Sequence, residues 1–327
     1  MTNRKNPSSI QDTLKAIMGA QRIILCAHLQ PDGDTIGSLL AMKALLERLG
    51  KEVTAICHDP VPKNLHILNG WEAVQLASEC TIDRFDLFCA LDCSDSDRLG
   101  DALPLFNKAP LKMVIDHHAS NTFYGDINYV DSKVAATGNL VFRLYEAAEM
   151  EIPIEVTPYL YAALSSDTGN FAFGQMDEEF FVQISNLLKA GLDITRYSRA
   201  LHLMKEVDFV KLLSRALASL SFICDGKISY MCLTQQDFKE SETAPESAEG
   251  LVNYALNLPG VQMCFLATET RENRVKFNLR AIQPHNVAEI ATHFGGGGHV
   301  LAAGCTLEMP FEKAVSLMKE RMSQSVC

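Results

Sequence analysis

Aspartate and histidine residues recur in four short motifs in the first part of the chain, each just after an apolar run. The motifs are His28-Leu-Gln-Pro-Asp32-Gly-Asp34, Asp92 in ALDCSD, Asp116-His117-His118, and Asp167 in SSDTG. In an open α/β sheet, functional side chains gather beyond the carboxyl ends of the strands. At least three of the motifs follow predicted strands, so we expect the motifs to converge there from distant parts of the chain.

Metal binding is the chemistry that this set of residues favours. Carboxylates placed close together raise one another's pKa, which makes such a crevice costly to build. A bound divalent cation removes that cost, and two do so more fully; carboxylates with imidazoles suit Mn²⁺ and similar ions. We therefore predict one or two bound divalent metal ions, and these residues do not decide between Mn²⁺, Co²⁺ and Mg²⁺. The imidazoles of His28 and His117 disfavour Mg²⁺, which prefers all-oxygen ligand shells.

The apolar runs that precede the motifs predict short buried strands, with helices between them. Strands are expected at 22–27, 52–57, 86–91 and 111–115, and helices at 36–49, 134–148 and 158–166. Gly50 stands where a helix over 36–49 would end. This alternation is typical of a parallel sheet that is covered by helices on both faces.

A second, smaller α/β domain is predicted after a helical stretch. The pattern from 180 to 220 has little Gly or Pro and indicates closing helices and a connector. Beyond it, strands are expected at 227–233, 261–269 and 274–280, and helices near 248–258, 287–294 and 311–322. We therefore predict an α/β protein with a first domain over 1–190, a helical connector over 191–220 and a second domain over 221–327.

A run of four glycines in the second domain indicates a phosphate-binding loop. Gly295, Gly296, Gly297 and Gly298 directly precede His299. Glycines let a backbone approach a ligand closely with several N–H groups exposed. His299 and the upstream Arg280 can donate to a phosphate, and arginine does so bidentately. The run could also be a flexible loop, although the histidine and the following Ala-Ala-Gly favour a packed turn.

Together the motifs resemble those of the DHH phosphoesterases, specifically DHH/DHHA1 proteins of the nano-RNase and pAp phosphatase (3′,5′-bisphosphate nucleotidase) type. The matching residues are His28, Asp32, Asp34, Asp92, Asp116-His117-His118, Asp167, Asn278-Leu-Arg280, Gly295-Gly-Gly-Gly-His299 and Ala302-Ala-Gly304. They span nearly the whole chain in the order of that family. The resemblance implies an N-terminal DHH domain with a mainly parallel sheet flanked by helices, followed by a smaller α/β DHHA1 domain.

The resemblance also implies how the metals would be held. One Mn²⁺ would be bound by His28, Asp32 and Asp92. The second would be bound by Asp34, Asp92, His117 and Asp167. Asp92 would then bridge the two ions, and a water between them would be the nucleophile.

Further residues would act around the metals. His118 would face the substrate phosphate instead of a metal, and Asp116 would orient an imidazole, as ligand histidines usually require. Arg98, six residues past Asp92, would meet the phosphate. Arg280, His299 and the glycine loop would grip the end of the substrate away from the metals.

Each motif alone has a plainer interpretation. An Asp-His-His triplet is common in loops. The cluster from His28 to Asp34 could be a turn that caps the helix beginning near residue 36. Asp92 could simply end a strand, and Thr137 is interpreted as a helix N-cap. Cys93 replaces a commoner threonine of the family, and we do not expect it to bind metal.

The composition and charge of the chain limit the kinds of molecule that we expect it to bind. The 327 residues have a net charge of −11 and no basic stripe of the kind that grips long nucleic acid, so we expect small nucleotides or short RNA instead. The ten cysteines form no C-x-x-C pair and mostly lie in apolar runs, which predicts buried thiols in a reducing cytosol. The N-terminus does not resemble a signal peptide, and no run reaches the ~18 to 20 apolar residues of a membrane span. We expect a cytoplasmic protein without a membrane partner; a homodimer is common in such families.

Three substrates compete within the predicted class of metal-dependent phosphoesterase. They are pAp, cut at its 3′-phosphate, RNA of two to five nucleotides, degraded from an end, and a cyclic dinucleotide or its linear product pApA. An inorganic pyrophosphatase of the wider superfamily is disfavoured by the glycine loop. A non-catalytic nucleotide sensor would be expected to have a damaged metal set, and no predicted ligand is missing.

Overall fold

A computed structural model describes residues 7–326 of the chain, which divides into two compact units, Met1–Met204 and Lys205–Cys327. The predicted helical connector over 191–220 is not a separate segment. α7 (Ile194–Ser198) and a π-helical turn (Arg199–Leu203) belong to the first unit, whose core includes Leu201. α8 (Val207–Ala218) belongs to the second unit, because Leu212 and Ala216 are buried against its sheet.

The first unit contains a six-stranded sheet in which every pair of neighbours is parallel. The strands are β1 (Arg22–Cys26), β2 (Glu52–Cys57), β3 (Val74–Leu76), β4 (Leu87–Leu91), β5 (Lys112–Asp116) and β6 (Ile127–Val130). Their order is β3-β2-β1-β4-β5-β6. The chain runs outward from β1 in one direction and then returns to β4 on the other side, so β1 and β4 form the topological switch point at which such sheets bind ligands.

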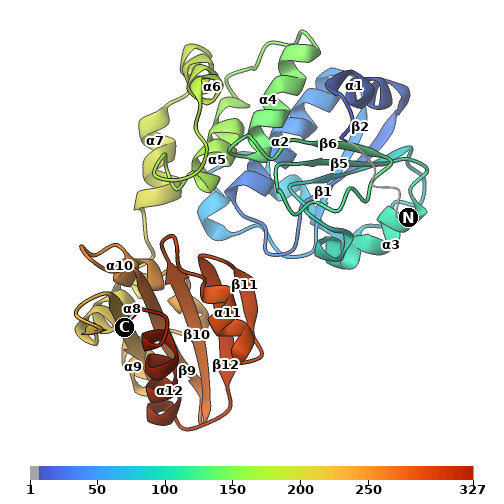
Figure 1. Ribbon diagram of the computed structural model, residues 1–327. Helices are drawn as coiled ribbons and strands as arrows, with labels where there is room; N and C mark the ends of the chain where they lie inside the picture. The colour runs from blue at the N-terminus through green and yellow to red at the C-terminus, as the bar shows by residue number, and fades with distance from the viewer. Residues whose placement is uncertain (1–6, 327) are drawn as a thin grey trace. The chain divides into compact units, whose positions relative to one another are not determined.

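Helices cover both faces of this sheet, as Figure 1 shows. Alternate residues of the strands enter two different cores: Ile23 and Leu25 of β1 lie in one, and Ile24 and Cys26 in the other. The first core is closed by α1 (Ile10–Gly19), α2 (Gly33–Arg48), α4 (Thr137–Ala147), α5 (Thr157–Asp167) and α6 (Glu178–Lys189). The second core is closed by α3 (Leu103–Lys108) and by 3₁₀ turns at Ala77–Glu79 and Ser96–Ala102. The predicted fold class is confirmed for this unit.

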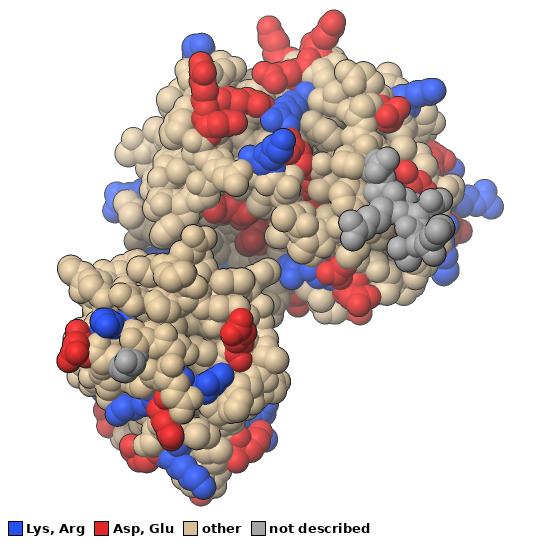
Figure 2. Space-filling model, in the orientation of Figure 1, with Lys and Arg blue, Asp and Glu red and all other residues tan. Residues whose placement is uncertain are grey.

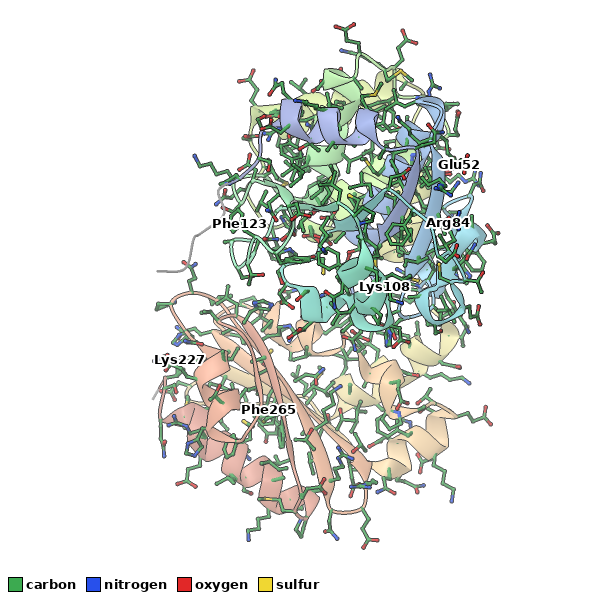
Figure 3. All side chains as sticks on the ribbon, turned by 90° about the vertical axis from the view of Figure 1, so that its right-hand side faces the viewer. Glu52, Arg84, Lys108, Phe123, Lys227 and Phe265 are labelled. Atoms are coloured by element: carbon green, nitrogen blue, oxygen red, sulfur yellow. The ribbon has the colours of Figure 1, made fainter. Side chains whose placement is uncertain are left out.

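The second unit contains a mixed sheet with the order β11-β12-β10-β9-β8-β7. The strands are β7 (Ser221–Ile223), β8 (Ile228–Leu233), β9 (Met263–Arg271), β10 (Arg274–Ala281), β11 (Gly297–His299) and β12 (Ala302–Leu307). α8, α9 (Gln235–Ser241) and α10 (Val252–Leu256) cover one face, and α11 (Val287–His293) and α12 (Phe311–Ser323) cover the other. Phe265, labelled in Figure 3, is fully buried in this core and stacks on Tyr230.

Several predicted elements differ in detail from those observed. The stretch from 180 to 220 is not one continuous helix: Gly191 adopts φ +101° and ends α6, and a second break at 204–206 precedes α8. Eight cysteines are free thiols, two of them only partly buried, whereas Cys224 takes part in a disulfide, so the prediction of buried thiols is wrong for Cys224. Within residues 7–326, no helix is long and apolar enough to cross a membrane.

Candidate metal centre

The carboxyl ends of three neighbouring strands bring the predicted residues to one edge of the first sheet. His28 lies two residues beyond β1, Asp92 directly follows β4, and Asp116 is the last residue of β5. β1 pairs with β4 and β4 with β5, so these side chains meet although they are far apart in sequence. Asp92 adopts φ +58°, a left-handed conformation that costs free energy for a residue with a side chain and that recurs at functional sites.

Two helices position three of the remaining predicted ligands, and the fourth, His117, directly follows β5. Asp32 is the N-cap of α2 and accepts a hydrogen bond from the Thr35 N–H (3.0 Å), while Asp34 lies in the first turn and is fully buried. The helix begins at Gly33, three residues before the predicted start at residue 36. α5 packs closely on this turn: a Cβ atom at Gly33 would lie 1.8 Å from the Ser166 Oγ. This close approach lets Asp167, at the end of α5, reach the crevice.

The structure brings the six predicted metal ligands into two adjacent groups, each able to hold a metal ion. One group is His28, Asp32 and Asp92, and the other is Asp34, His117 and Asp167. The carboxylate of Asp92 lies between them: its Oδ2 is 3.4 Å from His28 Nε2, and its Oδ1 is 3.6 Å from His117 Nε2. His117 Nε2 also lies 3.0 Å from Asp167 Oδ2. Asp92 is thus placed to contact an ion in either group.

The electrostatics of the crevice fit divalent cations. Burial and the charge of Asp92 raise the pKa of Asp34 well above its usual value, and they raise that of Asp32 as well. The pKa of Asp92 is lowered, because His28 and His117 outweigh the effect of its burial. Among the described residues, His117 Nε2 is buried without a hydrogen-bond partner, although carboxylates surround it. A buried ring nitrogen together with the carboxylate oxygens that it faces is a ligand set that suits a cation such as Mn²⁺.

We expect Mn²⁺ binding to strengthen as the pH rises. Burial lowers the pKa of His117, but Asp167, Asp34 and Asp92 outweigh burial and raise it to about 10, so the metal-free protein carries this proton at neutral pH. A metal binds only the neutral imidazole, so each released proton should raise the apparent affinity about tenfold per pH unit below that pKa. Calorimetric titrations between about pH 6.5 and 8.5, in buffers of different ionisation enthalpy, would count the protons. Affinity that is independent of pH would contradict this protonation state.

Hydrogen bonds from three hydroxyl side chains and from one helix N-terminus fix the buried carboxylates. The Thr35 and Thr137 hydroxyls donate to the two oxygens of Asp92 (2.7 and 2.9 Å). The N–H groups of Thr137 and Gly138, at the start of α4, donate to Asp34 (2.6 and 3.0 Å), as does the Ser38 hydroxyl. The N-cap of α4 is Ala136, so the interpretation of Thr137 as an N-cap is wrong. These supporting residues were missed, although a Thr-Gly pair that opens a helix is a signal for anion binding.

His118 is held by Asp116 and not by the two groups of predicted ligands. Its Nδ1 lies 2.8 Å from Asp116 Oδ1, and Asp116 is fully buried and also accepts from the Asn121 amide (2.5 Å). The hydrogen bond to Asp116 raises the pKa of His118. Although His118 also lies within reach of Asp92 and His117, its Nδ1 is already engaged. The hydrogen bond to Asp116 therefore fixes the orientation of the ring.

Arg98 lies at the edge of the centre, on the 3₁₀ turn that follows β4. Its Nη2 is 3.1 Å from His28 Nδ1, which also lies 2.6 Å from the Leu29 carbonyl oxygen. When His28 Nε2 binds a metal, Nδ1 carries the hydrogen and donates to that carbonyl. In that state Nδ1 would not accept from Arg98, and the guanidinium would lose this contact.

The motifs of the second unit lie on three adjacent strands. Ala302 of β12 pairs with Arg280 of β10 on one side and with His299 of β11 on the other. Directly paired residues of antiparallel strands point to the same face, so Arg280 and His299 flank the small Ala302 on one face, roughly 10 Å apart. The glycine run is not an open loop throughout: Gly297 and Gly298 belong to β11, and Gly296 packs on Gly304 and Cys305 so closely that a side chain would clash.

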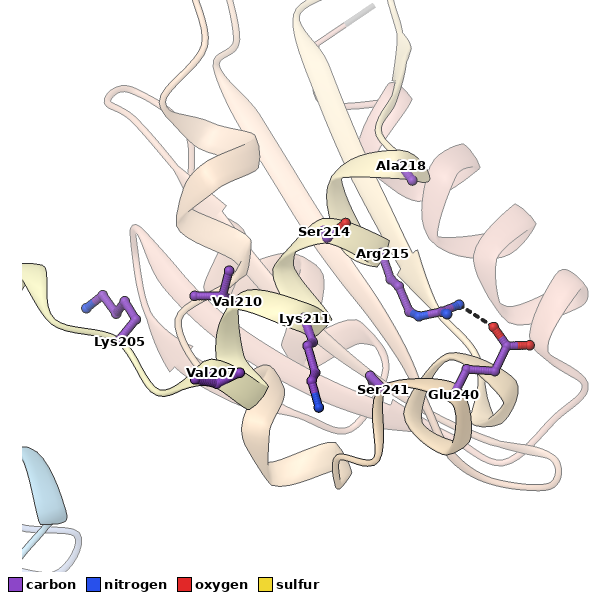
Figure 4. Close-up of a pocket in the computed structure, with 9 residues that line it drawn as sticks. All are labelled: Lys205, Val207, Val210, Lys211, Ser214, Arg215, Ala218, Glu240 and Ser241. Atoms are coloured by element: carbon purple, nitrogen blue, oxygen red, sulfur yellow. Dashed lines mark ion pairs between the residues drawn. The ribbon is translucent and has the colours of Figure 1, made fainter.

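Other surface features of the described residues do not extend this site. Figure 4 shows a hollow of about 840 Å³ on α8 and α9 of the second unit, whose Arg215 and Glu240 form an ion pair with each other (2.6 Å). None of the predicted site residues lines it. On the face drawn in Figure 2, Lys and Arg side chains are scattered among Asp and Glu and form no continuous basic stripe.

Comparison with known families agrees with this geometry. The model of the DHH family, N-terminal domain, matches residues 22–164, and that of the DHHA1 domain matches residues 225–324. The chain belongs to the DHH/DHHA1 family. It is therefore a DHH-family phosphoesterase with a candidate metal site of histidine and aspartate residues.

Relatives of this DHH/DHHA1 protein cover its whole length. One relative is a bifunctional oligoribonuclease and PAP phosphatase NrnA from Thermus thermophilus, which is 28% identical to this chain. The match covers 97% of this chain and 94% of the relative. The protein of the same name from Bacillus subtilis is 24% identical over 90% of this chain and 92% of its own. An exopolyphosphatase-related protein from Bacteroides fragilis has a similar structure, with a TM-score of 0.90 and 25% identity over 96% and 95% of the two chains.

Proposed function

We propose that this protein hydrolyses short oligoribonucleotides and removes the 3′-phosphate of pAp, with two divalent ions, Mn²⁺ by preference, bound at the edge of the first sheet. The observation that carries the proposal is the position of Asp92, whose two oxygens face His28 and His117 from between two ligand groups. The names of the two NrnA relatives and the net charge of −11 support a short nucleotide as the substrate.

The metal ions would be held by His28, Asp32, Asp34, Asp92, His117 and Asp167. When bound, two divalent ions supply Lewis-acid stabilisation of phosphate charge and lower the pKa of water. His118, oriented by Asp116, donates a proton to the leaving oxygen. Arg98 contacts the reacting phosphate, and its guanidinium neutralises part of the charge that develops there.

Residues of the second unit contribute substrate binding in this proposal. Arg280 and His299 present two donors on one face of the sheet, and the glycines allow a ligand to approach the backbone. Gly295 and Gly298 have φ +74° and +141°, conformations in which a side chain would be strained. Such a surface suits the phosphate or carboxylate-like end of a small anion better than a long polymer.

The test is a product assay by chromatography with Mn²⁺ and a panel of substrates. The panel holds pAp, RNA of two to five nucleotides, pApA, cyclic di-AMP and pyrophosphate. We expect turnover of pAp and of the short RNAs that a chelator abolishes and added Mn²⁺ restores. Turnover of pApA or cyclic di-AMP alone would replace the proposed substrates. Tight nucleotide binding without turnover would indicate a sensor, and cleavage of pyrophosphate alone would contradict the proposed role of the second unit.

A further inference from the structure

A histidine near the end of the first unit is hydrogen-bonded to the helix that carries Asp167. His202 Nε2 lies 2.8 Å from the Oγ of Ser165, which is fully buried two residues before Asp167. His202 belongs to the π-helical turn Arg199–Leu203, directly before the boundary between the two units. π-helical turns are rare in proteins, and those that occur often lie at functional sites. The predicted ligands do not include His202, and the function proposed above does not use it.

The chain that follows Asp167 has an unfavourable backbone conformation. Three consecutive residues, Gly169, Asn170 and Phe171, have φ values of +54°, +57° and +69°. Glycine tolerates this region and asparagine visits it, but a bulky residue such as phenylalanine is an outlier there. A conformation of this kind persists only where the surrounding structure holds it.

The segment around His202 holds both sides of this loop. Ser165, the partner of His202, accepts a hydrogen bond from the Asn170 N–H through its carbonyl (2.7 Å). The side-chain oxygen of Asn170 accepts from the hydroxyls of Tyr161 (3.2 Å) and Ser198 (3.4 Å). The loop is thus tied to the end of the first unit both before and after Asp167.

The loop is packed on one side, where Phe171 contacts the rings of Tyr161 and Phe180, and is open on the other. A hollow of about 690 Å³ opens between the loop and the last helical turns of the unit, and Asn170, Phe171, Ser198 and Arg199 are among its lining residues. Side chains beside a hollow lose contacts that would otherwise fix them. On the open side, the hydrogen bonds of Ser165 and Asn170 are therefore the contacts that fix the loop beside Asp167.

We propose that His202 is a positioning residue that fixes Asp167 through Ser165 and thereby preorganises one of the two metal groups. The role rests on the proposed use of Asp167 as a metal ligand. His202 itself contacts neither metal nor substrate. Because it lies two residues before the boundary, it connects the last turn of the first unit to the metal centre through side-chain and backbone contacts.

The first test uses amide hydrogen exchange of the metal-free full-length protein. His202→Ala should raise exchange in the peptides that contain residues 165–171, by about threefold or more, because the loop opens more often. His202→Gln keeps a donor and an acceptor at a similar reach and should restore slow exchange. His285→Ala is the matched control, because it removes a histidine side-chain contact of similar length, from His285 Nε2 to Gln262 Oε1 (3.0 Å), in the second unit. It should leave the exchange of residues 165–171 unchanged.

The second test measures Mn²⁺ affinity calorimetrically, independently of turnover. His202→Ala should weaken Mn²⁺ binding at one of the two sites by about tenfold, the lower end of the effect of an outer-shell partner. Ser165→Ala should do the same, and the double variant should be no worse than either single one. Unchanged exchange, or unchanged Mn²⁺ affinity in both single variants, would overturn the proposal. A wild-type protein that binds Mn²⁺ but hydrolyses nothing would contradict the proposed function and leave this inference intact.

Discussion

Replacing Asp92 with asparagine is expected to lower the rate of pAp or short-RNA hydrolysis by on the order of 10⁴-fold. When several groups act as one catalytic unit, the loss of one of them removes most of the rate enhancement of the whole unit. Asp92 is the residue whose two oxygens face His28 and His117, and a neutral amide presents one oxygen and one NH₂ group in their place. One of the two ligand groups therefore loses its anionic oxygen whichever way the amide is turned. Calorimetry should show weaker Mn²⁺ binding at both sites.

The same substitution should destabilise the metal-free protein at neutral pH. The pKa of Asp92 is lowered in the folded state, because His28 and His117 outweigh burial. A group with a lowered pKa contributes stability above its unfolded pKa and loses that contribution as the pH falls through the folded value. The asparagine variant lacks this contribution, so its melting temperature should be lower than that of the wild type at pH 7.

Asp86 offers a matched control for this experiment. It directly precedes β4, at the opposite end of the strand from Asp92, and accepts hydrogen bonds from the N–H groups of Gln21 and Arg22. Asp86→Asn carries the same chemical change and should keep both Mn²⁺ sites and the rate of hydrolysis. If Asp92→Asn retained the wild-type rate, the bridging role would be refuted, whatever its effect on melting.

The sequence was sufficient to find the residues that bear the chemistry of the metal centre. Histidine and aspartate residues at the ends of apolar runs indicate a shared site, because the carboxyl ends of parallel strands lie at the same edge of the sheet. Asp92 and Asp116 follow β4 and β5 as expected. The sequence did not reveal Thr35 and Thr137, since a threonine that supports a ligand has the same local pattern as one that caps a helix.

The remaining differences have physical causes that the periodicity of the sequence does not show. α2 begins at Gly33 and not at residue 36, because the Asp32 side chain caps it there and Gly33 lets α5 pack against the first turn. The stretch from 180 to 220 breaks where Gly191 turns left-handed, and α8 joins the second unit through its buried Leu212. The glycine run pairs as an edge strand because its partner, β12, follows within a few residues. None of these contacts is visible in local periodicity.

Replacing His118 with glutamine should lower kcat by about 10² to 10³-fold, within the range for the loss of a general acid. The Asp116 hydrogen bond, aided by Asp92, outweighs burial and raises the pKa of His118, so the imidazole keeps its proton to higher pH than a free histidine. Donation to the leaving oxygen needs that proton. Activity that depends on His118 is therefore present below its raised pKa and is lost as the pH rises through it. The variant should lose this alkaline limb from its pH–rate profile.

A change of leaving group distinguishes proton donation from metal binding by His118. An activated ester with a p-nitrophenolate leaving group needs little protonation, so His118→Gln should hydrolyse it at nearly the wild-type rate, while hydrolysis of pAp falls. A metal ligand would affect both substrates equally and would lower the number of Mn²⁺ ions bound. Arg280→Ala is the contrasting variant: a residue that only holds the substrate should raise KM more than it lowers kcat. If His118→Gln lowered the rate of hydrolysis of both esters equally and also bound one Mn²⁺ ion fewer, His118 would be a metal ligand. The leaving oxygen would then have no proton donor from the protein.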